Sequence, residues 1–285
     1  MTLLEAVLLG AIQGIFMFVP VSSTSHLALS QHWLIERGSL LPPPDSPELI
    51  LFDLVVHVGT MVSVAVVFRA SLGRLLRGAW ADLVDRAAHG RDRNGRYLRL
   101  IAMGALATLT TGILGLLIQA VGTAVFATPM IIAALLTITG AVLFWTDRAG
   151  PRWRGLDGIT PTFAVAVGAV QGLALLPGLS RSGLTIAMAL ALGLHRRWSA
   201  EFSFFIAIPT ILGGSVLQAA LVASDGEPLL IEPLAFASGF VVAAVVGIVA
   251  LVVVLRLLYR ARFRYFSYYV WALALAVALG VIAPV

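Results

Sequence analysis

Long apolar segments, separated by short polar ones, run through the whole chain. Six of these segments are long enough to cross a bilayer as a helix, which takes about 20 consecutive apolar residues. The predicted spans cover residues 50–68, 98–119, 127–146, 200–223, 233–258 and 266–284. This pattern predicts an all-α polytopic membrane protein with six transmembrane helices.

Two further apolar regions, residues 3–35 and 160–195, are interrupted in the middle by a proline and a polar run. Each half has roughly 12–17 residues and is about 18–25 Å long at a helical rise of about 1.5 Å per residue. A half is therefore too short for a hydrocarbon core of about 30 Å. We expect two re-entrant helix–loop–helix hairpins, each of which enters and leaves the membrane on one side.

The two interrupted regions also resemble each other in sequence. The stretch GAIQGIFMFVPVSS at residues 10–23 is similar to GAVQGLALLPGLSRS at 168–182, and a span with related spacing follows each of them. Each half of the chain then holds one hairpin and three spans, and an odd number of crossings gives the halves opposite orientations. The sequence predicts one integral-membrane domain built as an inverted-topology repeat, with halves 1–146 and 147–285.

Composition agrees with a membrane protein. The 285 residues are 60% hydrophobic and 12% charged, whereas soluble domains carry about 25% charged residues. The chain contains no cysteine, which excludes disulfides and thiolate chemistry.

The distribution of arginine predicts the orientation in the membrane. Most arginines lie between spans, in the segments 69–99, 148–154, 196–197 and 256–264. The positive-inside rule places such segments in the cytoplasm, so both termini are expected outside. The basic charge therefore indicates membrane orientation and gives no reason to expect a nucleic-acid partner.

Each interruption begins at a proline, Pro20 in the first region and Pro177 in the second. Proline lacks an N–H donor and pushes the preceding residue out of helical geometry. A hydroxyl side chain is expected to cap the half-helix that follows, and the candidates are Ser22, Ser23, Ser180 and Ser182. Two capped N-termini present free N–H groups and positive dipole ends to the loops, which favours an anion.

Arg181 lies inside the second break, at membrane depth. An arginine there costs about 2.5–3.5 kcal/mol and needs a negative partner, and no acidic residue is near it in sequence. His26, after the first break, titrates close to neutral pH and can move protons. One guanidinium, several hydroxyls and two helix N-termini together predict a cradle for a phosphate or pyrophosphate.

Simpler interpretations are open for single residues. Serine and threonine in membrane helices often bond only to a backbone carbonyl one turn back, and Gln13 and Gln171 could simply hydrogen-bond between helices. Asp53 and Glu201 each open a span, where first-turn acids are common. His57 is one turn beyond Asp53 and could pair with it, but is interpreted as structural.

At these motifs the chain resembles the undecaprenyl-diphosphatase family, the bacitracin-resistance type of membrane phosphatase. The resemblance covers nearly the whole chain and rests on QGIFMFVPVSSTSHL, LFDLVVHVGT, PGLSRSGLT followed by ALGL, and FSFFIAIPTILGG. It implies six spans, two re-entrant hairpins and inverted halves. It also implies removal of the terminal phosphate from undecaprenyl diphosphate at the outer face of the bacterial inner membrane, which recycles the lipid carrier of cell-wall synthesis. A divalent cation such as Mg²⁺ and a homodimer are implied as well.

The resemblance also suggests roles for individual residues. Ser23 and His26 fall on the candidate nucleophile and its proton partner, and Arg181 falls on the phosphate clamp. The residues expected to bind substrate are Gln13, Ser22, Thr24, Gln171, Ser180, Ser182 and Thr185. Met17 departs from the family, which has an acid at this position, so the metal ligands are unknown here. An acid there would help to hold a cation or accept a proton.

Three functions therefore remain open. In the first, which is favoured, a hydroxyl or imidazole attacks the terminal phosphorus of the lipid diphosphate. In the second, the same cradle binds a polyprenyl phosphate and the inverted halves move it across the membrane without hydrolysis, which Met17 favours. In the third, the chain is an inactivated variant.

Overall fold

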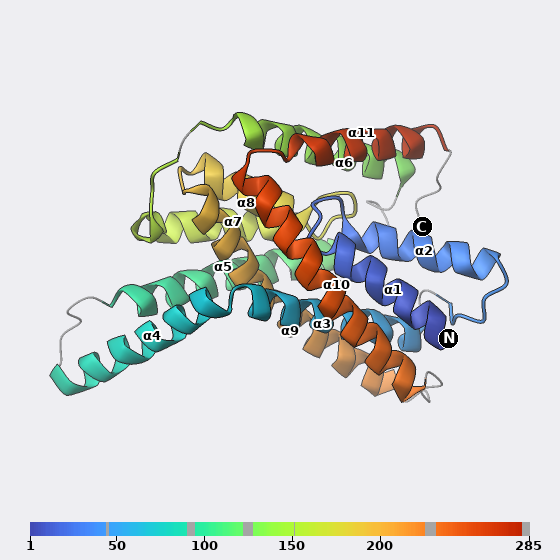
Figure 1. Cartoon of the computed structure of the whole chain (residues 1–285), viewed down its shortest axis with the longest axis horizontal. Coiled ribbons are helices and arrows are strands. Elements are labelled where there is room, and N and C mark those ends of the chain that lie inside the picture. Colours follow the sequence, from blue (N-terminus) through green and yellow to red (C-terminus); the bar gives the residue numbers. More distant parts are fainter. Residues whose placement is uncertain (44–45, 90–94, 122–127, 151, 226–231, 281–285) are drawn as a thin grey trace.

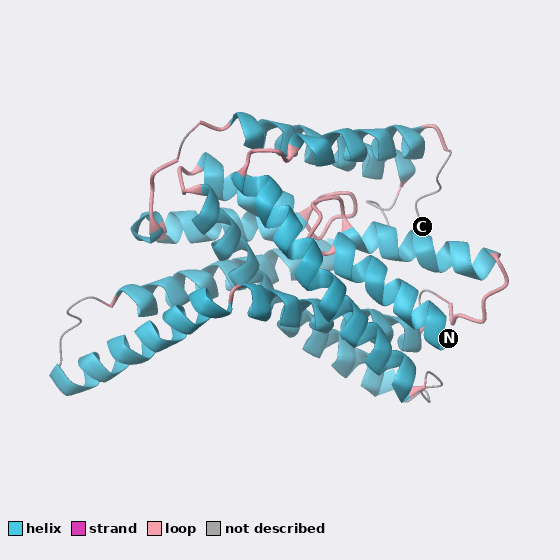
Figure 2. Cartoon of the chain, viewed as in Figure 1, coloured by secondary structure: helices cyan, strands magenta, loops and turns pink. Residues whose placement is uncertain are grey.

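The computed structural model describes residues 1–43, 46–89, 95–121, 128–150, 152–225 and 232–280, and this part of the chain consists of helices joined by loops (Figures 1 and 2). The first half contains α1 (Leu3–Phe16), α2 (Ser23–Glu36), α3 (Pro47–Val67), α4 (Arg69–His89), α5 (Arg96–Val121) and α6 (Pro129–Arg148). The second half contains a short 3-10 turn (Leu156–Gly158), α7 (Pro161–Leu173), α8 (Arg181–Ala191), α9 (Arg196–Asp225), α10 (Pro233–Tyr259) and α11 (Arg264–Ala278).

Within the described residues, five helices are long and apolar enough to cross a membrane, namely α3, α5, α6, α9 and α10. They correspond to five of the six predicted spans, as expected for a multi-pass membrane protein. The sixth predicted span, 266–284, corresponds to α11, which has 15 residues and ends at Ala278; residues 281–284 of that span lie outside the described part. The segment between the first two spans is largely helical, because α4 occupies residues 69–89.

Each interrupted region folds into two helices around a loop, α1 with α2 and α7 with α8. Figure 2 shows these two loops side by side at the centre of the molecule. Figure 1 shows α6 and α11 packed against each other along one edge of the molecule. Between these two helices, the Trp271 indole N–H donates to the carbonyl of Thr137 at 3.2 Å.

Glycines at matching positions of the two repeated motifs bring helices into backbone contact. Gly10 of α1 faces α10, where a Cβ on it would collide with the carbonyl oxygen of Gly239. Gly168 of α7 faces α5, where a Cβ would collide with the carbonyl oxygen of Ala107. The hairpin helices α1 and α7 are therefore each fixed along a long helix, and this fixes where their loops lie.

Candidate functional site

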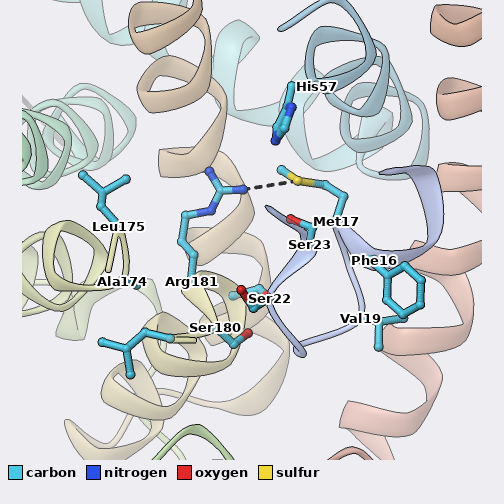
Figure 3. A pocket seen from close by; sticks show the side chains of 12 residues that line it. Phe16, Met17, Val19, Ser22, Ser23, His57, Ala174, Leu175, Ser180 and Arg181 are labelled. Atoms are coloured by element: carbon cyan, nitrogen blue, oxygen red, sulfur yellow. Dashed lines mark hydrogen bonds between the residues drawn. The ribbon is translucent and has the colours of Figure 1, made fainter. Parts of the chain in front are cut away.

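A cavity of about 180 Å³ lies where the two loops meet (Figure 3). Its polar lining consists of Ser22, Ser23, His57, Ser180, Arg181 and Ser182. Its apolar lining consists of Phe16, Met17, Val19, Ala174, Leu175 and Leu179. Residues from both halves of the chain therefore meet at one site, as the sequence predicted for the two breaks.

The first loop is held in an unusual backbone conformation. Ser22 has φ 70° and ψ 87° in the left-handed region, which costs a non-glycine residue roughly 1–2 kcal/mol. Its side chain forms a hydrogen bond with the Ser25 hydroxyl at 3.0 Å and does not cap α2. The expected cap by Ser22 is therefore wrong, and its hydroxyl stabilises the turn of the loop instead.

His26 stabilises this loop through hydrogen bonds at both of its ring nitrogens. Its Nδ1 lies 2.8 Å from the carbonyl oxygen of Ser22, so Nδ1 carries the proton and donates. Its Nε2 then accepts from the hydroxyl of Tyr269 on α11 at 2.7 Å. The ring stacks on Phe16 and is 8% exposed. Both ring nitrogens are thus engaged, and His26 is not among the described residues that line the cavity; its predicted role as proton partner stays a prediction.

The second loop is tied to α6 by a single hydroxyl. Gly178 has φ 91°. The Thr139 hydroxyl donates to the carbonyl of Gly178 at 2.9 Å. The same hydroxyl oxygen accepts from the Ser180 N–H at 3.2 Å. Ser180 Oγ in turn accepts from the Gly183 N–H at 3.2 Å, which confirms the predicted cap of α8. Arg181 is the first residue of α8, so these contacts orient its side chain.

The guanidinium of Arg181 reaches across the cavity to Met17. Arg181 Nη2 lies 3.4 Å from the Met17 sulfur, and Gln13 Nε2 lies 3.6 Å from the same atom. A thioether is a weak acceptor, so this contact leaves the donors of Arg181 available to a stronger acceptor. Because the described residues that line the cavity include no Asp or Glu, an anionic ligand would meet no opposing negative charge.

His57 of α3 also lines the cavity, which the sequence did not predict. Its Nδ1 lies 2.7 Å from the carbonyl oxygen of Asp53 and therefore donates to it. The Asp53 carboxylate accepts instead from Gln31 Nε2 at 2.8 Å. His57 thus forms a hydrogen bond with the backbone carbonyl of Asp53 and not with its carboxylate. His57 lies within LFDLVVHVGT, one of the segments that carry the resemblance, but a single histidine one turn from an acid gives no sign of where its ring points.

The other predicted binding residues lie around the cavity or behind it. Ser23 and Ser182 line it with the residues above. Gln171 is fully buried and donates to the hydroxyls of Thr111 and Thr210 at 3.1 and 3.0 Å.

Two of these residues reinforce the helices instead. Thr185 donates to the carbonyl of Arg181 at 2.8 Å and also contacts Ser203. Gln13 is fully buried, is not among the described residues that line the cavity, and contacts the lining residue Met17. The Thr24 side chain lies outside the described part of the structure. Their roles in substrate binding stay predictions.

The donors at this site do not fit a divalent cation such as Mg²⁺. Mg²⁺ prefers oxygen ligands and is usually bound through carboxylates, whereas the thioether of Met17 is a soft ligand. Within the described ranges, no cluster of three or more His, Cys, Asp or Glu residues could hold a metal ion. Carboxylates are likewise missing from the described lining of the cavity.

Comparison with known proteins gives a consistent family assignment. The family model described as bacitracin resistance protein BacA matches residues 6–276. A relative from Alkalilimnicola ehrlichii, named undecaprenyl-diphosphatase, is 55% identical over 99% of this chain and 98% of its own length. Relatives of the same name from Halorhodospira halophila and Desulfosudis oleivorans are 52% and 37% identical, over 98% and 95% of this chain and 98% and 95% of their own lengths.

Proposed function

The chain belongs to the family of the bacitracin resistance protein BacA, and we infer that it hydrolyses undecaprenyl diphosphate to undecaprenyl phosphate. It is a phosphatase that recycles the lipid carrier of cell-wall synthesis. The observation that carries this function is the guanidinium of Arg181 in a cavity lined by hydroxyls and lacking acids in its described lining. The guanidinium can donate two hydrogen bonds side by side, which suits the oxygens of a phosphate.

The two kinds of cavity lining suit the two parts of the substrate. Arg181, with the capped N-terminus of α8 beside it, offers charge-assisted donors to the diphosphate. Leu175 and Leu179 offer an apolar wall, against which the first isoprene units of the lipid would pack. The lipid is thus held with its phosphates at the loops and its chain toward the bilayer.

For the chemical step we propose Ser23 as the nucleophile. Its oxygen attacks the terminal phosphorus, the bond from that phosphorus to the bridging oxygen breaks, and undecaprenyl phosphate leaves. Arg181 stabilises the charge on the phosphoryl oxygens during this step. Water then releases the phosphate from Ser23. His26 supports the step indirectly, because it fixes the carbonyl of Ser22, the residue before Ser23.

We further propose the finer topology that the sequence predicts: six spans, two re-entrant hairpins and inverted halves 1–146 and 147–285. The matching backbone contacts of Gly10 with α10 and of Gly168 with α5 support it. The arginine-rich segments favour termini on the outer side by the positive-inside rule, and in this topology we propose that the cavity opens on the outer side of the bacterial inner membrane. A homodimer, implied by the resemblance, remains part of this proposal.

Phosphate release from undecaprenyl diphosphate by the purified protein in detergent micelles tests the function, with Arg181→Ala as the comparison. We expect release by the unaltered protein and little by the variant. One observation favours a second candidate function, carriage of a polyprenyl phosphate without hydrolysis, namely that Met17 occupies the position of the family's acid. Tight binding of the lipid diphosphate without any phosphate release would favour the carrier.

A further inference from the structure

We propose that His57 is the proton-transferring residue of this hydrolysis and that turnover needs no divalent cation. The inference rests on the proposed phosphatase function and adds a catalytic residue to it. It depends on the geometry of His57 and on the donor set of the cavity.

The hydrogen bonds of α3 determine which nitrogen of His57 can act. The Asp53 carbonyl can only accept, so the proton of the neutral ring is on Nδ1, which lies 2.7 Å away. Nε2 then carries a lone pair. Nδ1 is used by the helix backbone and the ring lines the cavity, so Nε2 is the atom that can accept a proton from a reacting group there.

The rotation of α3 about its axis is what brings this ring to the cavity. Phe52 and Val56 are fully buried against α10, where both pack on Gly239. Residues 53 and 57 follow them by one position and occupy the adjoining face of the helix. The packing of Phe52 and Val56 therefore turns His57 toward the loops.

His57 is also the one imidazole in the described lining of the cavity, and the lone pair of its neutral ring can accept a proton. Arg181 remains protonated in proteins, and the serine hydroxyls are the groups to be deprotonated. Figure 3 shows the imidazole of His57, the guanidinium of Arg181 and the hydroxyl of Ser23 directed toward the same space around the Met17 sulfur. His26 cannot take this role in the same geometry, because Tyr269 already donates to its Nε2.

The side-chain atoms around the cavity explain why proton transfer to His57 would take the place of catalysis by a metal ion. A cation-assisted site needs oxygen ligands, and Met17 provides sulfur at the place between Gln13 and Arg181. Charge on the phosphoryl oxygens is instead neutralised by the guanidinium of Arg181. The remaining requirement is removal of a proton from the nucleophile, which an imidazole can meet without a metal.

The proposed step balances without any further reactant. As Ser23 Oγ bonds to the terminal phosphorus, its proton moves to His57 Nε2, and the electron pair of the breaking P–O bond leaves with undecaprenyl phosphate. A water oxygen then attacks the phosphorus of the phosphoserine. The P–Oγ bond breaks, Oγ takes the proton back from His57 Nε2, and the protons of the water leave with the inorganic phosphate.

The test compares His57→Gln with His195→Gln, an exposed histidine outside the cavity, in phosphate release from undecaprenyl diphosphate. General acid–base catalysis contributes about 10²–10⁴-fold, so we expect kcat of His57→Gln to fall by that factor with KM nearly unchanged. Added imidazole should restore part of the activity of His57→Gln and leave His195→Gln unaffected. The unaltered protein should keep its rate after treatment with EDTA.

A wild-type kcat in His57→Gln would overturn the proposed role of His57. Loss of wild-type turnover in EDTA, with recovery on adding Mg²⁺, would overturn the metal-free step, and this arm does not depend on folding of a variant. Failure of the phosphatase function is distinguishable from both: the unaltered protein would then release no phosphate with or without Mg²⁺, and the inference would fall with it.

Discussion

Arg181 Nη2 lies 3.4 Å from the sulfur of Met17, which joins the first residue of α8 to the residue directly after α1. The two residues come from opposite halves of the chain and meet over the cavity. A cation in a membrane protein is normally matched by an acid or a ligand, whereas among the described residues the guanidinium of Arg181 donates to a thioether. This contact makes the charge of Arg181 available to the substrate.

Arg181→Ala should therefore weaken binding of the lipid diphosphate by roughly 10- to 150-fold, because a hydrogen bond to a charged group contributes about 1.5–3 kcal/mol. Arg181→Lys should retain a small part of the affinity, since lysine keeps the charge and loses the fork. Binding of labelled undecaprenyl diphosphate to protein in nanodiscs measures this. Arg77→Ala, on exposed α4, is the matched control. Unchanged affinity in Arg181→Ala would place the diphosphate elsewhere.

Tyr269→Phe should lower both stability and turnover modestly. The change removes the hydroxyl that donates to His26 Nε2 at 2.7 Å, and a lost hydrogen bond of this kind costs about 0.5–1.5 kcal/mol. His26 would then hold the left-handed Ser22 less firmly, so kcat should fall without being abolished. Thermal unfolding and phosphate release measure the two effects. Tyr268→Phe, its exposed neighbour on α11, should show neither effect; equal losses in both variants would argue against a role of His26 in holding the loop.

Gly10→Ala and Gly168→Ala should each destabilise the protein, because the added Cβ meets a backbone carbonyl of the facing helix, which cannot rotate away as a side chain can. Overpacking of this kind typically costs about 1–3 kcal/mol. Thermal unfolding in detergent measures it. Gly112→Ala on α5, where a Cβ meets no atom within 4 Å, is the control and should unfold at the same or a higher temperature. If all three variants behaved alike, the helices would not be in direct contact.

The topology can be tested with single cysteines, since the natural chain has none. Leu40, between α2 and α3, is 87% exposed, and Trp153, between α6 and α7, is 84% exposed. A membrane-impermeant thiol reagent applied to intact cells should label Leu40→Cys and spare Trp153→Cys, and permeabilised cells should label both. The reverse pattern would invert the orientation and move the cavity to the cytoplasmic side.

Much of the architecture could be predicted because a bilayer constrains the sequence strongly. Backbone groups in hydrocarbon must be paired within helices, so span lengths and the two proline breaks are visible as apolar runs and interruptions. Arg181 is visible for the same reason, since a cation in such a region needs a ligand. The short described length of α11, at 15 residues, shows the limit of this argument, because apolar character alone does not fix where a helix ends.

The orientations of the two histidines could not be predicted, because each depends on a distant part of the chain. His57 faces the cavity through the packing of its neighbours on α10, nearly two hundred residues later in the sequence. His26 is turned away from the cavity by Tyr269, which is 243 residues later. A sequence shows that a histidine follows a break, but the partner of each ring nitrogen comes from tertiary packing.

The substitution Met17→Glu places a carboxylate in the cavity, where the family has an acid. The new side chain would replace the sulfur that lies 3.4 Å from Arg181 Nη2, so an ion pair should form and occupy the guanidinium. Without a divalent cation, the negative charge would also repel the substrate, and phosphate release should fall below that of the unaltered protein. With Mg²⁺, the carboxylate can bind the ion, which neutralises the repulsion and polarises the phosphoryl oxygens.

Met17→Glu should therefore be activated by Mg²⁺ and inhibited by EDTA, while the unaltered protein responds to neither. Phosphate release at several Mg²⁺ concentrations measures this for both proteins. Met17→Gln is the matched control, because it has a similar length and polarity without the charge and should show no dependence on Mg²⁺. The contrast separates the effect of the charge from that of the changed shape. If Met17→Glu kept full activity in EDTA, the carboxylate would not reach Arg181, and the contact between residues 17 and 181 would not control the charge of the cavity.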